Sequence, residues 1–155
     1  MSRIKTAKQC AKAMWAGDAA SKALDIKIEI REAGSATAHM RIREDMINGF
    51  DVCHGGLIFT LADTAFAFAC NAYDRVTVAA SGSIEFIRPA RLGDKLSATA
   101  REEYRGSRSG YYAVEVQNDL GELVALFRGR SASRDQPVIG PDAAAALNDT
   151  DSIEK

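Results

Sequence analysis

Short stretches in which hydrophobic and polar residues alternate make up most of this chain, and one long apolar stretch interrupts them. In residues 23–32 every second side chain from Leu24 to Ile30 is apolar, and those between them are charged. A period of two is typical of a strand with one buried face. Residues 37–43 alternate in the same way after a turn at residues 33–35, so we expect a hairpin.

The remaining elements follow from the same kind of pattern. Four further strands are predicted over residues 77–88, 95–104, 111–118 and 122–133. A short alanine-rich helix is predicted over residues 6–16, and an irregular connection over residues 46–56 contains the turn pair Asn48-Gly49. Beyond Asp135 the chain carries prolines, glycines and acidic residues, which indicates a weakly ordered tail.

The long apolar stretch is predicted as a helix from about residue 56 to residue 73. Its apolar residues lie on all sides, which is typical of a helix that is covered on most of its surface. The order of helix, two strands, long helix and four strands predicts an α+β fold, with one curved antiparallel sheet of five or six strands wrapped on the long helix. Such a sheet leaves one face and two edges uncovered, which favours oligomerisation. We expect an N-terminal helix over residues 1–21, the main domain over 22–136 and the tail over 137–155.

Composition narrows the function classes. At 155 residues the chain is most simply one domain, and its net charge of −1 gives no reason to expect a nucleic-acid or membrane-surface partner. Its three cysteines cannot all pair within one chain, so we expect reduced thiols and a cytoplasmic protein. Its two histidines have no ligand spacing for a metal, and we predict neither a metal site, a secretory signal nor a membrane span.

The candidate chemistry lies in the long helix. Asp63 is the single charge within it, and a buried carboxylate costs several kcal/mol unless it is paired or hydrogen-bonded. Gly55 and Gly56 precede it at the expected helix start, where unpaired backbone N–H groups form a positive end. This helix therefore offers a single acid or base, Asp63, and a helix start that could polarise a carbonyl. That combination suits acyl chemistry.

One helix cannot easily bring both groups to one substrate. Eight residues separate Gly55 from Asp63, which is about 12 Å along a helix axis. The reacting atoms must lie about 3 Å from their partners. Two copies running antiparallel across a two-fold axis satisfy both distances, so we expect a site shared between protomers.

These residues also resemble a known family. Two motifs carry the resemblance to the hotdog-fold acyl-CoA thioesterases, closest to the PaaI type of phenylacetate degradation: Asn48-x5-His54-Gly55-Gly56 and Leu61-Ala62-Asp63-Thr64-Ala65. The similarity extends over about residues 22–136. The His-x4-Pro arrangement of the dehydratase branch is missing, because Phe59 stands where the proline would be.

The resemblance implies hydrolysis of an aryl-acyl-CoA such as (hydroxy)phenylacetyl-CoA, by homodimers that pair into tetramers, with no cofactor because coenzyme A is part of the substrate. It implies that Asp63 is the general base or the nucleophile and that the Gly55 N–H polarises the thioester carbonyl. Asn48 and His54 would be supporting polar residues, and Thr64 would help to orient water. Gly56 and a set of arginines are candidates for binding CoA, whose phosphates need cations or backbone donors. The arginines in or beside predicted strand ends and loops are Arg88, Arg91, Arg105, Arg108 and Arg128.

Structural explanations stay open for most of these residues. His54 is more simply a capping residue than a base, Asn48 is explained by its turn, and a helical Thr64 commonly bonds back to a carbonyl one turn earlier. A non-catalytic acyl-CoA sensor of the same fold is the alternative function, although residues 1–21 hold no helix-turn-helix. An oligomeric scaffold without a ligand would leave Asp63 unexplained.

Overall fold

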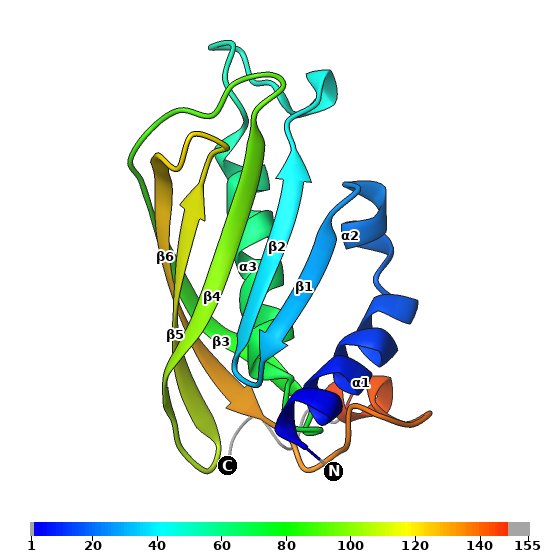
Figure 1. Cartoon of the computed structure of the whole chain (residues 1–155). Coiled ribbons are helices and arrows are strands. Elements are labelled where there is room, and N and C mark those ends of the chain that lie inside the picture. The colour runs from blue at the N-terminus through cyan, green and yellow to red at the C-terminus, as the bar shows by residue number, and fades with distance from the viewer. Residues whose placement is uncertain (1, 149–155) are drawn as a thin grey trace.

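The computed structural model describes residues 2–148 and consists of one six-stranded antiparallel sheet wrapped around a long helix (Figure 1). The strand order in the sheet is β1-β2-β4-β5-β6-β3. The helices are α1 (Arg3–Ala16), α2 (Ala19–Ala23) and α3 (Gly55–Cys70), with short 3₁₀ turns at Glu44–Met46 and Ala144–Leu147. The strands are β1 (Lys27–Glu32), β2 (Ser35–Arg41), β3 (Thr77–Phe86), β4 (Lys95–Arg105), β5 (Ser109–Gln117) and β6 (Leu123–Ser133). The α+β hotdog architecture expected from the sequence is confirmed.

Small side chains on α3 allow the helix to lie close to the sheet. Ala62, Ala65 and Ala69 are completely buried, and α3 packs against β2, β4 and β5. Larger side chains fill the space beside them, with Phe66 contacting the ring of Tyr112 at a centroid distance of 5.3 Å. This packing fixes the rotation of α3 about its axis and therefore decides which residues point away from the sheet.

One stripe of α3 is not covered by the sheet. Thr60, Asp63, Thr64 and Ala67 are half-buried, and Gly56 is exposed. These positions follow the spacing of three and four residues that places side chains on one helix face. The expectation that the helix is covered on most sides is correct, and the uncovered stripe is the one that carries the acid.

The two edges of the sheet differ. Helix α1 packs against the edge strand β1, whereas β3 pairs only with β6 and leaves most of its side chains exposed. Phe86, at the end of β3, is 54% exposed, and the following Ile87 is 53% exposed. An uncovered strand edge with apolar side chains is a surface for pairing with another strand.

A polar cluster closes the end of the sheet away from the start of α3. The Glu102 carboxylate accepts hydrogen bonds from the hydroxyls of Tyr73 (2.7 Å) and Tyr112 (3.0 Å). The Arg105 guanidinium lies 3.7 Å from the centre of the Tyr73 ring. Burial, followed by the contact with Glu102, raises the pKa of Tyr73 to about 12, so its hydroxyl is a donor throughout the neutral range.

The first strand is shorter than its sequence pattern predicts. Residues 23–26 are not part of β1, because α2 ends at Ala23 and Asp25 adopts a left-handed backbone with φ of 54°. The alternation still has its physical basis, since Ile26 is completely buried ahead of the strand. Asp18 forms the N-cap of α2 by accepting the Ser21 N–H at 3.0 Å, a start signal that the sequence analysis did not use.

Part of the chain after β6, which the sequence analysis assigned to the tail, packs against α1. Val138 and Ala146 are 5% and 8% exposed and pack against Cys10 of α1. The Ile139 N–H donates to the Asp74 carboxylate at 2.9 Å. The prediction for residues 149–155 lies outside the described residues.

The three cysteines, Cys10, Cys53 and Cys70, are free and buried, as expected for thiols that pack in the core. Burial raises the pKa of Cys53 to about 11 and that of Cys70 to about 12, so neither is a ready nucleophile. Among the helices of residues 2–148, none has the length and apolar character needed to cross a membrane.

Candidate active site

The start of α3 presents a backbone donor that the protein itself does not use. His54 is the N-cap, and its Nδ1 accepts the Gly56 N–H at 2.9 Å. Within residues 2–148 the Gly55 N–H has no hydrogen-bond acceptor. The helix dipole adds a partial positive charge at the same place. Gly55 therefore offers an oriented donor for a carbonyl oxygen.

One backbone bond joins this helix start to the 3₁₀ turn that ends at Met46, and a second joins it to the chain that follows β3. The His54 N–H donates to the Met46 carbonyl and the Cys53 N–H donates to the Ala90 carbonyl, each at 2.8 Å. The Asn48 side chain stabilises the loop between them, since its Oδ1 accepts the N–H groups of Phe50 (2.9 Å) and Val52 (3.3 Å). Loop support is thus the role that the structure shows for Asn48, and its side-chain amide N–H groups have no acceptor within residues 2–148.

A hollow of about 320 Å³, which we call the Gly55 hollow, lies beside the free N–H. It is lined mainly by Val52, Gly55, Phe86, Ile87 and Arg88. A Cβ added to Gly55 would lie 3.0 Å from Cζ of the Phe86 ring, which is closer than side chains normally approach. Glycine at this position therefore keeps the apolar wall of the hollow near the donor.

Asp63 lies two turns further along α3 on the uncovered stripe. It is half-buried, and no described residue donates a hydrogen bond to its carboxylate or forms an ion pair with it. Desolvation by burial raises the pKa of Asp63 above its ordinary value. An unpaired carboxylate with a raised pKa is suited to accept a proton from water or to attack a carbonyl. Asp63 does not line the Gly55 hollow of its own chain.

Thr64 is less available than its neighbour. Its hydroxyl donates to the Thr60 carbonyl at 2.7 Å, the back-bond that the sequence analysis gave as the structural alternative. Only its oxygen lone pairs remain for a water molecule.

Comparison with known proteins identifies the family. The model of a family described as thioesterase superfamily matches residues 50–125. The acyl-coenzyme A thioesterase PaaI of Escherichia coli (strain K12) is 46% identical over 123 residues, which cover 79% of this chain and 88% of that protein. The chain belongs to the thioesterase superfamily. The resemblance to the PaaI-type acyl-CoA thioesterases is thereby confirmed, as is the prediction of a thioester hydrolase.

Structural similarity agrees with the sequence. The E. coli PaaI protein from the phenylacetic acid degradation operon superposes with a TM-score of 0.86 at 43% identity, covering 88% of this thioesterase and 99% of that chain. A putative esterase of Archaeoglobus fulgidus is 37% identical over 75% of each chain.

The arginines named as CoA-binding candidates are spread over the thioesterase. Arg88 lines the Gly55 hollow, and Arg91 follows in the same connection between β3 and β4. Arg128 lies on β6 and pairs with Glu103 at 3.0 Å.

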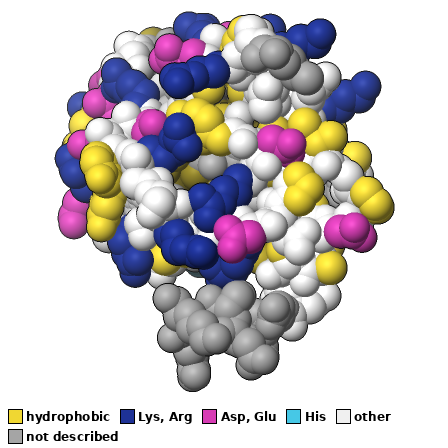
Figure 2. Space-filling model, turned by 90° about the horizontal axis from the view of Figure 1, so that it is seen from below, with side chains coloured by type: hydrophobic (Ala, Val, Ile, Leu, Met, Phe, Trp, Pro, Cys, Tyr) yellow, Lys and Arg dark blue, Asp and Glu magenta, His cyan; other side chains and the backbone are white. Residues whose placement is uncertain are grey.

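The other two candidates lie at the opposite end of the molecule. Arg105 ends β4, and Arg108 lies in the β4–β5 turn, at the bottom of Figure 1, where it pairs with Asp135 at 3.5 Å. Many Lys and Arg side chains gather on this lower end (Figure 2). Of the five candidates, Arg88 is the one that lines the hollow at the start of α3.

The sequence analysis missed the apolar wall of the hollow. Phe86 and Ile87 provide it, and both are exposed despite their size. The signal was present in residues 84–90, where apolar residues continue past the alternating part of the strand. Within residues 2–148, no group of three or more His, Cys, Asp or Glu side chains is placed to hold a metal ion.

Proposed function

We propose that this protein hydrolyses an aryl-acyl-CoA thioester, such as (hydroxy)phenylacetyl-CoA, to the free acid and CoA. The observation that carries the proposal is that one helix holds both a half-buried Asp63 without a hydrogen-bond partner among the described residues and a free N–H at Gly55. The phenylacetic acid degradation operon named for the E. coli PaaI structure supports an aryl-acetyl group. Phe86 and Ile87 supply an apolar surface beside the donor.

The reaction requires two contributions from the protein. Attack on the thioester carbonyl places negative charge on its oxygen, and an oriented N–H at that position stabilises the charge by about 3–4 kcal/mol. Asp63 either takes the proton from the attacking water or attacks the carbonyl itself, forming an anhydride that water then opens. In both routes the C–S bond breaks and CoA leaves as a thiolate, which needs less protonation than an amine.

The site is completed by a second copy of the chain. The separation of about 12 Å along α3 between Gly55 and Asp63 exceeds the reach of one reacting group. An antiparallel copy joined along the exposed edge of β3 extends the sheet and runs its α3 opposite to the first. The Gly55 hollow of one protomer then faces the Asp63 of its partner chain. We propose this homodimer as the functional unit and a dimer of dimers as the larger assembly.

A mixing experiment tests the shared site. Asp63→Ala and Gly55→Val are each expected to be inactive as purified proteins. After denaturation and refolding together, half of the dimers are mixed, and each mixed dimer holds one site with both native groups, so about a quarter of the wild-type activity returns. If both groups act within one chain, no activity returns. Each variant refolded alone is the control.

Substrate choice is tested by release of the CoA thiol from a panel of aryl- and alkyl-CoA esters. We expect the highest kcat/KM with phenylacetyl or hydroxyphenylacetyl esters, because the hollow beside Gly55 is small and apolar. Similar rates with long alkyl esters would contradict the aryl assignment. Binding of CoA esters without turnover would favour the alternative, a non-catalytic acyl-CoA sensor. Since the three buried thiols form no disulfide, we also propose a reducing compartment, the cytoplasm, as the location.

A further inference from the structure

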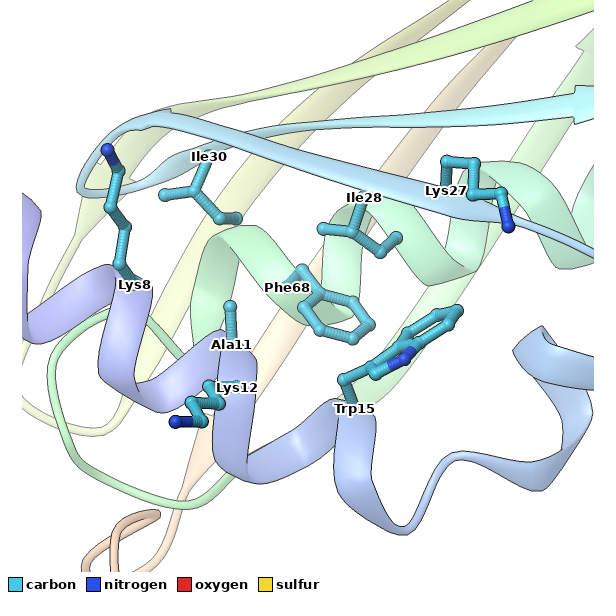
Figure 3. Close-up of a pocket in the computed structure, with 8 residues that line it drawn as sticks. All are labelled: Lys8, Ala11, Lys12, Trp15, Lys27, Ile28, Ile30 and Phe68. Atoms are coloured by element: carbon cyan, nitrogen blue, oxygen red, sulfur yellow. The ribbon is translucent and has the colours of Figure 1, made fainter.

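A second cavity of about 540 Å³ lies between α1 and β1, with Phe68 of α3 at its base. We call it the Trp15 groove (Figure 3). Its walls are apolar and come from three elements: Ala11 and Trp15 of α1, Ile28 and Ile30 of β1, and Phe68 of α3. The volume falls within the range of about 300–1,000 Å³ that is typical of small-molecule sites.

Aromatic groups dominate the middle of this groove. Figure 3 shows the rings of Trp15 and Phe68 side by side, with the isoleucines of β1 opposite Ala11. Phe68 is buried, whereas Trp15 is half-buried and open to the groove. The Lys22 ammonium lies 5.9 Å from the centre of the indole ring and donates to the Ala16 carbonyl at 2.9 Å. A planar ring bound here gains contact with fixed aromatic faces.

The rim of the groove is basic. Lys8, Lys12 and Lys27 line it, and no acidic residue does. Lys27 pairs with Asp25 at 3.1 Å, whereas Lys8 and Lys12 have no ion-pair partner within residues 2–148. The two unpaired lysines are four residues apart on α1, where like charges repel and an anion between them relieves the repulsion.

We propose that the Trp15 groove is a binding site for an aromatic carboxylate, whose ring lies against Trp15 and Phe68 and whose carboxylate faces Lys8 and Lys12. The site is separate from the hydrolytic one, because neither Gly55 nor Asp63 lines it. An aromatic carboxylate is also the class of product released by the proposed hydrolysis. Binding at the groove does not depend on that activity, so the two proposals fail independently.

Trp15 is the only tryptophan in the chain, so its fluorescence reports on this groove directly. Titration of the full chain with phenylacetate should change the emission and reach saturation. Phenylacetamide, which has the same shape without the charge, should bind more weakly. The variant Lys8→Gln/Lys12→Gln should weaken phenylacetate binding about threefold to tenfold, as expected for two partly screened charge contacts. The matched control Lys5→Gln/Lys95→Gln removes two exposed lysines outside the groove and should leave binding unchanged.

A second variant fills the groove without changing its charge. Ala11→Phe should abolish the phenylacetate response while far-UV circular dichroism and thioesterase activity stay as in the wild type. Equal binding of phenylacetate and phenylacetamide, or equal loss in the two double lysine variants, would overturn the proposal. Trp15 emission that changes with protein concentration and is insensitive to phenylacetate would show that a second copy of the chain covers the groove.

Discussion

Replacing Asp63 with asparagine tests its role in catalysis separately from its effect on stability. The substitution keeps the shape of the side chain and removes its charge and its basicity. Since no described residue bonds to the Asp63 carboxylate, the variant loses no contact within the chain. Any fall in activity then comes from the chemistry and not from a disturbed fold.

Asp63→Asn should lower the activity and raise the stability. A general base contributes about 10²–10⁴-fold to the rate, so kcat for Asp63→Asn should fall by that factor. The free energy of unfolding should rise by about 0.5–2 kcal/mol, because a partly desolvated charge is removed from the folded state. For a chain of this length each kcal/mol raises Tm by about 2–4 °C.

The pH dependence provides an independent check. Burial raises the pKa of Asp63, so the folded protein retains this proton at pH values where the unfolded chain has lost it. The wild type therefore loses stability as pH rises through that window, and the variant should not show this part of the loss. Hydrolysis requires the deprotonated carboxylate, so wild-type kcat/KM should rise with pH along a limb that lies above the ordinary range of an aspartate.

The measurements are CoA-thiol release over a range of pH and thermal unfolding of wild type, Asp63→Asn and Asp119→Asn. Asp119 is an exposed carboxylate in the β5–β6 turn and serves as the matched control, with activity and Tm expected to stay at wild-type values. Activity of Asp63→Asn within about threefold of wild type would refute the role of Asp63 as base or nucleophile. A lower Tm would refute the claim that its carboxylate is unpaired.

Two further predictions concern other parts of the molecule. Gly55→Ala should lower kcat about tenfold or more, because the new Cβ meets the Phe86 ring at 3.0 Å and crowds the oxyanion position. Gly49→Ala, with open space around its Cβ, should be neutral in the same thiol-release assay. Equal effects of the two substitutions would contradict the steric argument. Glu102→Ala should lower the free energy of unfolding, measured by chemical denaturation, by about 2–4 kcal/mol, because two tyrosine hydroxyls lose their charged acceptor. Glu103→Ala breaks an exposed ion pair and should lower the same free energy by less than about 1 kcal/mol. A Glu102 variant as stable as the wild type would show that water replaces the carboxylate without cost.

The candidate site was readable from the sequence because each of its residues is an exception to its surroundings. Asp63 is the single charge in an apolar helix, and Gly55 and Gly56 stand together at the start of that helix. The role of His54 as a cap followed from its position before Gly55, and its Nδ1 contact with the Gly56 N–H confirms it. A helix cap and an isolated charge in an apolar segment are both defined by neighbouring residues along the chain, so they can be recognised in the sequence.

Strand boundaries were less well predicted, because the alternation of apolar and polar residues indicates which side chains are buried and not which backbone groups form the sheet hydrogen bonds. Ile26 fits the alternating pattern and is buried, yet it precedes β1, since Asp25 turns the backbone. Val138 and Ala146 lie in a segment with the composition of a loose tail, and both are buried against Cys10 of α1, which is far away in the sequence. Composition cannot indicate such a contact.

The residue pattern by itself determined that this chain has a long central helix, a set of half-buried strands and a single acid in an apolar helix that begins with two glycines. Only the tertiary structure decided that β3 lies at the edge of the sheet beside β6, that Phe86 stands over Gly55, and that Trp15 and Phe68 line one groove with a basic rim. The physical reason is that period and propensity act over a few residues, whereas strand order and packing between elements depend on which distant surfaces fit together.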